Sequence, residues 1–321
     1  MYLEYFNLNE EPFRLTPDPR FLHLAEPHRD ALRTLLQTVV LRKGFAVCAG
    51  PVGTGKSTLV HAAIHILTDR TLARSPIASA MIVNPLLSRN EFLEALLEEF
   101  EVACPPGNKQ RQLLALQQML LEVQGRGSTA VLIVDEAHLL TLDLLEEIRL
   151  LSNLDSYREK LLQVILCGQS ELLSLLAKPE MAALRQRIAA QCLLRPLSLP
   201  ETRSYVAERL HVAGSKGPSV FTGAALEIIH HYSQGVPRLI NLICADALAL
   251  AFQSQRKPIE PDIIQEAATA LGLAGAGLGK NGKGSNGSRP RVTPEVQPAS
   301  SSVDTLIDAM RHGRTIARSE P

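Results

Sequence analysis

The chain has 321 residues and no tryptophan, and aromatic residues make up only 4% of it. Proteins that bind single-stranded nucleic acid by stacking bases need aromatic side chains, so the composition argues against such a surface. Lysine plus arginine number 33, as do aspartate plus glutamate, and the formal net charge is therefore zero. The basic excess that is typical of nucleic-acid-binding proteins is also missing.

Long apolar runs and paired cysteines are missing too. A membrane-spanning helix needs ~18 consecutive apolar residues, and the longest candidate, "LICADALALAF", is interrupted by Asp246. The N-terminus "MYLEYFNLNEEPF" has acidic residues where a signal peptide has a basic start. The cysteines are five, far apart and without a CxxC pair, so we expect small core residues in a reducing compartment. We therefore expect a cytoplasmic protein, located at the inner membrane only if a partner holds it there.

The middle of the chain alternates short apolar runs with helical periodicity. The runs that predict strands are "GFAVCAG", "ASAMIV", "TAVLIVDE", "LLQVILCG" and "QCLLRPL". Helices are predicted between them, beginning with Pro27–Leu41 and including one that opens at the capping-box pattern "SRNE". Alternation of this kind predicts a parallel sheet between two layers of helices.

The pattern changes near Leu197. Three helical segments follow, over 200–212, about 222–234 and about 237–253, and no strand pattern accompanies them. We therefore divide the chain into an N-terminal segment with its helix, an α/β domain, a small all-helical domain, and a flexible linker and tail. Their ranges are 1–43, 44–197, 198–270 and 271–321.

The tail is rich in Gly, Ser and Pro, which is typical of a flexible linker. Its last stretch, "VDTLIDAMRHGRTIA", places Leu306, Ile307 and Met310 at helical spacing. Two interpretations remain open. The stretch is either a weakly helical, disordered end or a docking peptide that folds on a membrane-protein partner.

The stretch "AGPVGTGKSTL" matches the phosphate-binding pattern GxxxxGK[ST], with a predicted strand before it and a helix after it. Its glycines allow backbone N–H groups to turn toward phosphate oxygens. Lys56 is expected to reach the β- and γ-phosphates of ATP, and the Ser57 hydroxyl to bind Mg²⁺. The residues predicted to bind the nucleotide are Gly50, Pro51, Val52, Gly53, Thr54, Gly55, Lys56, Ser57 and Thr58.

The stretch "VLIVDEAH" places two acidic residues at the end of a buried strand. Asp135 is expected to hold Mg²⁺, mostly through water, and would lie beside the phosphate loop if the two strands are neighbours. Glu136 is expected to orient or deprotonate the attacking water. "DEAH" is also a helicase box, but the other helicase motifs are missing. We expect His138 to pack or to orient this loop.

Four further polar residues are candidates for the reaction. Gln169 follows a core strand and could touch the γ-phosphate or the water. Arg185 and Arg187, within "LRQRI", could act on the nucleotide of a neighbouring subunit or form a solvated basic surface. Arg238 begins the last predicted helix of the lid, where the helix dipole does not stabilise a cation, and this favours a functional role.

In this order the elements resemble the AAA+ ATPases. Gly50–Ser57 resembles Walker A, Val131–Glu136 Walker B, Gln169 sensor 1 and Arg238 sensor 2. Within that family "YFNLNEEPFRLTPDPRFLHLAEPHRDAL", "GQSELL", "LRQRI" and "GVPRLINLICADALAL" resemble the ExeA, or general secretion pathway protein A, family over about residues 1 to 270.

The resemblance implies a P-loop NTPase fold of the AAA+ type: an αβα three-layer parallel sheet of order 5-1-4-3-2 with a small all-helical lid. It implies nucleotide at a subunit interface in a homo-oligomer, with Arg187 the better arginine-finger candidate. It also implies that Thr16–Arg20 and the segment before Gly44 lie near the adenine. Longer members add a transmembrane segment and a peptidoglycan-binding domain, and neither is seen here, so we expect a short form.

We therefore expect a Mg²⁺-dependent ATP hydrolase that acts as a switch in assembling an envelope-associated machine for secretion, pili or exopolysaccharide. A protein unfoldase is disfavoured because "NPLLSRNEFL" lacks an aromatic-hydrophobic-Gly loop. The alternative is a DNA-handling ATPase helper of the transposition or replication type, although the charge balance argues against nucleic acid. A third hypothesis, a switch that binds ATP without hydrolysing it, is disfavoured by the intact Glu136.

Overall fold

The computed structural model describes residues 2–16, 19–21, 25–69, 77–103, 107–154, 159–216 and 219–273. These residues form two compact units. Among the described residues, those within 26–195 form the α/β unit, and those within 2–25 and 196–273 form the helical unit. The predicted docking peptide at the C-terminus lies outside the described residues.

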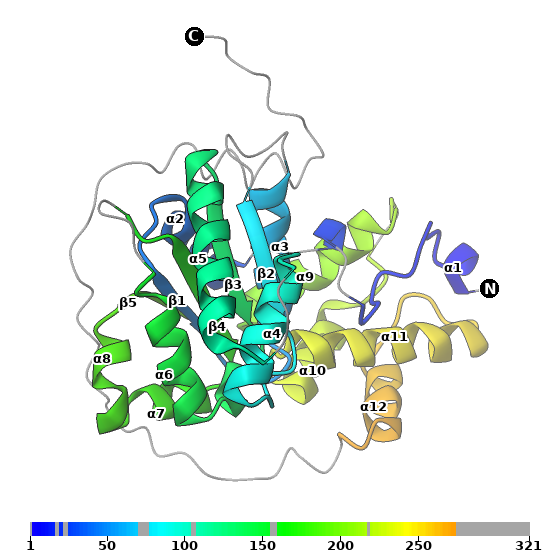
Figure 1. The fold of residues 1–321 in the computed structure, drawn as a ribbon. Helices are drawn as coiled ribbons and strands as arrows, with labels where there is room; N and C mark the ends of the chain where they lie inside the picture. The colour runs from blue at the N-terminus through cyan, green and yellow to red at the C-terminus, as the bar shows by residue number, and fades with distance from the viewer. Residues whose placement is uncertain are drawn as a thin grey trace. The chain divides into compact units, whose positions relative to one another are not determined.

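The α/β unit contains a parallel five-stranded sheet of order β2-β3-β4-β1-β5 (Figure 1). The strands are β1 (Phe45–Ala49), β2 (Ile77–Ile82), β3 (Thr129–Val134), β4 (Leu162–Gly168) and β5 (Ile188–Leu193). Strands β1 and β4 are buried along their whole length, as their unbroken apolar runs predict for strands covered on both faces. The predicted fold class and strand order are confirmed.

Helices cover both faces of this sheet. The helices α2 (Glu26–Val40) and α3 (Lys56–Thr68) pack on one face, and α4 (Arg89–Glu99), α5 (Lys109–Gly125) and α6 (Leu142–Leu151) pack on the other (Figure 1). The short elements η2 (Ala137–Leu139), α7 (Glu171–Leu176), η3 (Pro179–Met181) and α8 (Ala182–Arg185) connect the strands. The capping box predicted at "SRNE" is present, because the Ser88 N–H donates to Glu91 at 2.8 Å and the Glu91 N–H donates to the Ser88 hydroxyl at 3.3 Å.

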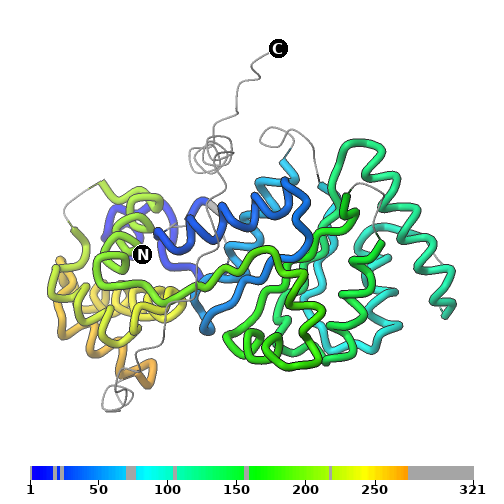
Figure 2. The backbone as a smooth tube through the Cα atoms, turned by 90° about the vertical axis from the view of Figure 1, so that its left-hand side faces the viewer, coloured from blue at the N-terminus to red at the C-terminus, as the bar shows by residue number. Residues whose placement is uncertain are grey.

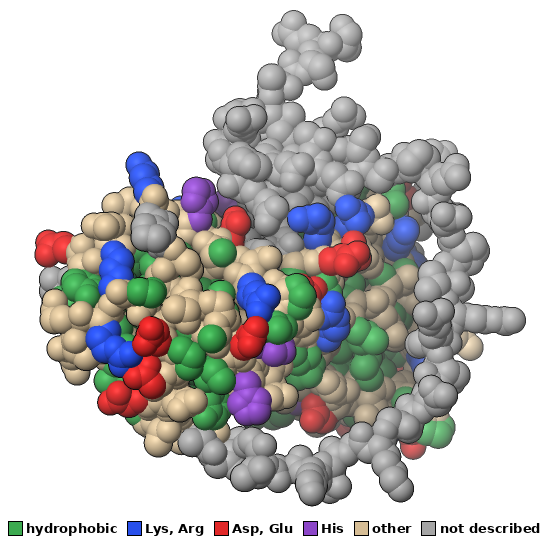
Figure 3. All heavy atoms as spheres, turned by 180° about the vertical axis from the view of Figure 1, so that it is seen from behind, with side chains coloured by type: hydrophobic (Ala, Val, Ile, Leu, Met, Phe, Trp, Pro, Cys, Tyr) green, Lys and Arg blue, Asp and Glu red, His purple; other side chains and the backbone are tan. Residues whose placement is uncertain are grey.

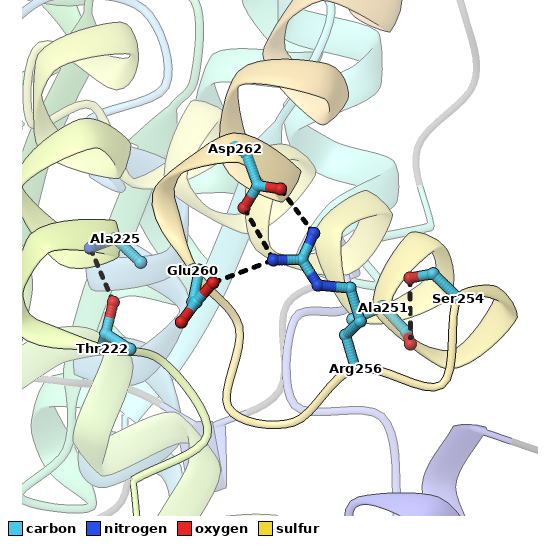
Figure 4. A network of polar contacts seen from close by, with 7 residues as sticks. All are labelled: Thr222, Ala225, Ala251, Ser254, Arg256, Glu260 and Asp262. Carbon is cyan, nitrogen blue, oxygen red and sulfur yellow. Dashed lines mark hydrogen bonds and ion pairs between the residues drawn. The ribbon is translucent and has the colours of Figure 1, made fainter.

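Four helices form the core of the helical unit. They are α9 (Leu199–Val212), α10 (Gly223–Ser233), α11 (Pro237–Gln253) and α12 (Pro261–Ala270). Gly235 separates α10 from α11 with a φ of +73°, and a Cβ there would lie 1.9 Å from the Leu197 carbonyl oxygen, so only glycine fits. The loop before α12 is fixed by Arg256, which binds the carboxylates of Glu260 and Asp262 (Figure 4).

The N-terminal segment packs on these helices (Figure 2). It contains α1 (Tyr2–Tyr5) and η1 (Pro19–Phe21). The buried guanidinium of Arg209 donates to the carbonyl oxygens of Pro12 at 2.6 Å and Arg14 at 3.2 Å, and to the Tyr205 hydroxyl at 2.9 Å. It also lies over the Phe21 ring, 5.1 Å from its centroid. A single buried cation thus holds an irregular segment whose carbonyl groups need donors.

The structure corrects the sequence-based prediction in three places. Helix α5 was not predicted, and α12 is a fourth helix where three were expected. The fifth strand begins at Ile188, earlier than the run "QCLLRPL" indicated. Within the described part of the chain, no helix combines the length and apolar character needed to cross a membrane.

Candidate nucleotide-binding site

The phosphate loop, the acidic pair and Gln169 lie at the carboxyl edge of the sheet, whereas Arg185 and Arg187 precede β5, at its amino end. Leu166 of β4 is in register with Val47 on one side and Val134 on the other. The phosphate loop directly follows β1, the acidic pair follows β3, and Gln169 follows β4. Strands β1 and β3 are therefore not direct neighbours, since β4 lies between them, and their backbones are about 10 Å apart. Ligands of open α/β sheets bind at this kind of edge.

The loop after β1 is shaped for close approach of a ligand to its backbone. Gly53 and Gly55 have φ values of +78° and +92°, which L side chains rarely adopt. A Cβ at Gly50 would lie 2.5 Å from the Leu194 carbonyl oxygen, so this position also requires glycine. The buried Lys56 amine donates to the carbonyl oxygens of Gly50 and Pro51, both at 2.9 Å. The loop therefore encircles its own lysine.

The first amide groups of α3 are open to a ligand. The N-cap residue is Gly55, and no described side chain caps this helix end. Helix N-termini carry unsatisfied N–H groups and a partial positive charge, which together bind phosphate. The loop and this helix end thus fit the phosphates of a nucleotide.

Asp135 is buried, and one backbone and one side-chain hydrogen bond hold it in place. Its N–H donates to the Ile82 carbonyl oxygen at 2.9 Å, and its Oδ1 accepts the Glu136 N–H at 2.9 Å. The Cys167 thiol is a neighbour of Asp135. Its pKa is raised by contact with Cys48, by burial and by the charge of Asp135, so the thiol stays protonated and neutral. The described residues include no group of three or more His, Cys, Asp or Glu arranged to hold a metal.

Glu136 has a strained backbone conformation, and its side chain lies beside His138, which also contacts Gln169. Its φ of +49° lies in the left-handed region, which is costly for a residue with a Cβ. Its Oε2 is buried, accepts no hydrogen bond from the described residues and lies 3.3 Å from His138 Nδ1. The Gln169 N–H donates to the same ring nitrogen at 3.4 Å. The turn after β3 and the end of β4 are thus joined through His138.

The two candidate arginines have different environments. Arg185 donates to the carbonyl oxygens of Leu176 at 3.1 Å and Ala177 at 3.2 Å, at the C-terminal end of α7. Arg187 donates to the Ser152 hydroxyl at 2.8 Å, directly after α6. The hydrogen bonds of Arg185 satisfy helix carbonyl groups, whereas Arg187 bonds the Ser152 hydroxyl and lies near the charge of Glu146. Arg238 is exposed at the second position of α11, in the helical unit.

Comparison with known proteins identifies the fold family. Residues 40–176 match the model of an AAA domain. General secretion pathway protein A of Aeromonas hydrophila is 38% identical over 287 residues, which cover 88% of this chain and 51% of that protein. The chain belongs to the AAA+ family. As an AAA+ protein related to general secretion pathway protein A, it is a nucleotide-binding protein.

Solved structures share the fold of this AAA+ chain. The ORC2 protein of Aeropyrum pernix, solved with ADPNP and ADP, superimposes with a TM-score of 0.61 at 15% identity, over 81% of this chain and 71% of that one. Drosophila ORC bound to DNA gives a TM-score of 0.60 at 18% identity, over 83% and 66% of the two chains. Identities this low show the fold alone. The AAA+ chain spans about half the length, 51%, of general secretion pathway protein A.

Three supporting residues of the AAA+ site were not singled out from the sequence. His28 of α2 places its Nε2 2.8 Å from the Thr54 carbonyl oxygen and so supports the phosphate loop from another element. Cys167 lies against Asp135, and Ser152 holds Arg187. Each of these residues is far in sequence from the residue that it contacts, and no local motif identifies it.

Proposed function

We propose that this AAA+ chain hydrolyses ATP with Mg²⁺ and acts as a nucleotide-driven switch. The observation that carries the proposal is the phosphate loop with its enclosed Lys56, on the same sheet edge as Asp135, Glu136 and Gln169. Mg²⁺–ATP would supply a γ-phosphoryl group for transfer to water.

In this proposal each residue has one role. Lys56 exchanges its two carbonyl partners for phosphate oxygens, and the backbone N–H groups of residues 50–58 bind the phosphates. The Ser57 hydroxyl and the Asp135 carboxylate hold Mg²⁺, a donor set that suits an ion which retains several waters. Glu136 orients and deprotonates the attacking water.

Polar residues around this set would respond to the nucleotide. Gln169 contacts the γ-phosphate or the water. Arg187 acts on the nucleotide of a neighbouring subunit in a homo-oligomer, and Arg238 closes the helical unit on the nucleotide. We keep the predicted division into 44–197 as the ATP-binding domain and 198–270 as its lid.

The proposed process is assembly or remodelling of an envelope-associated machine, as the name of the Aeromonas relative suggests. We place the protein in the cytoplasm, where the four described cysteines, all buried and free, remain reduced. Residues 271–321 would bind a membrane-protein partner. The alternative, a DNA-handling helper, is weakened because Lys and Arg are interspersed with Asp and Glu on the face shown in Figure 3.

The Glu136→Gln variant tests the catalytic assignment. The substitution retains the size of the side chain and removes its basicity, so ATP hydrolysis should fall by about 10²–10⁴-fold while nucleotide binding persists. Both are measurable, by phosphate release and by equilibrium titration with a fluorescent ATP analogue. Hydrolysis at the native rate by this variant would refute the role of Glu136.

A further inference from the structure

His138 lies where two groups make opposite demands on one ring nitrogen. The Gln169 N–H donates to Nδ1 at 3.4 Å, and this hydrogen bond requires a lone pair on Nδ1. Glu136 Oε2 lies 3.3 Å from the same Nδ1 and would need a proton there. One nitrogen cannot satisfy both neighbours, because it carries either a proton or an available lone pair.

The structure corresponds to the first of the two arrangements. The hydrogen bond from Gln169 is formed, whereas Glu136 Oε2 is buried and accepts none from the described residues. In the second arrangement the ring carries its proton on Nδ1 and donates it to Glu136, and the Gln169 amide loses its acceptor. The neutral ring can adopt either tautomer, so the choice between the arrangements needs no change of net charge.

The surrounding backbone keeps the three groups together. A Cβ at Gly168 would lie 3.0 Å from the His138 backbone nitrogen, so the glycine allows the end of β4 to approach this turn closely. The left-handed Glu136 places its side chain beside His138, and Asp135 Oδ1 accepts the Glu136 N–H. The ring itself is only 11% exposed, which limits access of water that could satisfy the orphaned oxygen.

We propose that His138 is a positioning residue that couples the Glu136 carboxylate to the Gln169 backbone amide, because its Nδ1 can pair with only one of the two groups at a time. When the Gln169 amide occupies Nδ1, the ring does not hold Glu136, whose side chain is 44% exposed and engages water through its other carboxylate oxygen. When the amide withdraws, the ring donates to Glu136 and holds the carboxylate away from the reaction. The position of the loop after β4 therefore sets the availability of the base.

This coupling rests on the proposed role of Glu136, but it has consequences in the nucleotide-free protein. Hydrogen exchange at the Gln169 amide and the His138 tautomer, read from ¹⁵N shifts of the labelled ring, report it directly. In His138→Leu the amide loses its acceptor, so its exchange should accelerate about tenfold. In Glu136→Gln the new side-chain amide can donate to Nδ1, and His138 should become entirely the Nε2–H tautomer.

The kinetic readout uses a conservative variant. His138→Leu should lower kcat about 10- to 100-fold with little change in KM for ATP, as for other residues that orient a catalytic group. His138→Asn, whose amide can donate or accept near the position of Nδ1, should restore most of the rate and slow the Gln169 amide exchange. His211→Asn, on the exposed part of α9, is the matched control and should change neither.

The outcomes separate the two claims. Unchanged Gln169 exchange in both His138 variants, or a ring that carries its proton on Nδ1 in Glu136→Gln, overturns the coupling whatever the rate of hydrolysis. If the wild-type protein hydrolyses no ATP while both nucleotide-free readouts respond as stated, the proposed function fails and the coupling stands. If His138→Leu does not fold, His138→Asn and Glu136→Gln still decide the question.

Discussion

Arg187 donates a hydrogen bond to the Ser152 hydroxyl at 2.8 Å. Ser152 ends the helix α6, which begins a few residues after Glu136, and its hydroxyl donates in turn to the Arg149 carbonyl oxygen at 2.7 Å. The arginine proposed to act on a neighbouring subunit is therefore held by a helix that starts at the subunit's own acidic turn. A shift of that turn would move the attachment point of Arg187.

Arg187→Ala should reduce ATP hydrolysis by about 10³–10⁵-fold, because an arginine supplied in trans neutralises charge in the transition state. Mixing this variant with Glu136→Gln should restore part of the activity, since mixed interfaces combine an intact Glu136 with an intact Arg187. Arg185→Ala is the control. It removes hydrogen bonds to α7 carbonyls, so it should lower stability more than kcat. No recovery in the mixture would place Arg187 outside the neighbour's site.

ATP should stabilise the chain against heat through Lys56. A ligand that binds only the folded state at 100 times its Kd adds about 2.7 kcal/mol to the free energy of unfolding. Lys56→Met should remove most of this gain. It also removes the hydrogen bonds of Lys56 to the buried Gly50 carbonyl oxygen and to the Pro51 carbonyl oxygen, so the ligand-free melting temperature of each protein is its own baseline. Differential scanning calorimetry with and without ATP measures both effects. An equal gain in both proteins would show that Lys56 does not contact the nucleotide.

Arg209→Met should release the N-terminal segment from the helical unit. The substitution leaves the Pro12 carbonyl oxygen and the Tyr205 hydroxyl without their buried donor, at a cost of about 2–4 kcal/mol. Urea unfolding and faster proteolysis within the first 20 residues should report the loss. The exposed Arg203, which pairs with Glu227, is the matched control, and Arg203→Met should cost no more than about 1 kcal/mol. Equal effects of the two substitutions would contradict the role given to Arg209.

Alkaline pH should destabilise the fold through its buried thiols. Burial, reinforced by the neighbouring Cys48, raises the pKa of Cys192 from 9.0 to about 12. Below pH 9 both folded and unfolded chains keep this thiol protonated, so it has no effect on stability there. Between pH 9 and 12 only the unfolded chain loses the proton, and stability falls by up to ~1.4 kcal/mol per pH unit for this group. Cys192→Ala should flatten this part of the profile, measured by urea unfolding from pH 8 to 11.

The sheet and the phosphate loop could be predicted because their signals are local. An unbroken apolar run such as "FAVCA" is typical of a strand that is covered by helices on both faces of the sheet. The glycines before Lys56 indicate backbone that must approach phosphate closely. Helix α5 was missed because its sequence is rich in glutamine and leaves Leu114 and Leu121 exposed, which blurs its apolar face. Helix α12 is short and follows a stretch of charged residues and prolines.

Relationships across the fold could not be predicted from local patterns. His138 and Gln169 are 31 positions apart, and Arg187 and Ser152 are 35 apart. Only the strand order β3-β4 and the packing of α6 bring these pairs together. The local pattern "LRQRI" does not separate Arg185 from Arg187, and only the family resemblance favoured Arg187. In the structure the two have different partners: Arg185 bonds carbonyl oxygens and Arg187 bonds a hydroxyl.

The most direct test of the account is the steady-state rate of ATP hydrolysis by the full chain, measured against protein concentration with and without DNA. We predict that the specific activity rises with protein concentration, because Arg187 comes from a neighbouring subunit. We also predict that adding DNA leaves this activity unchanged. The absence of hydrolysis at every concentration would contradict the proposed switch. Hydrolysis that appears only with DNA and fades with salt would contradict the envelope role and favour a DNA-handling ATPase.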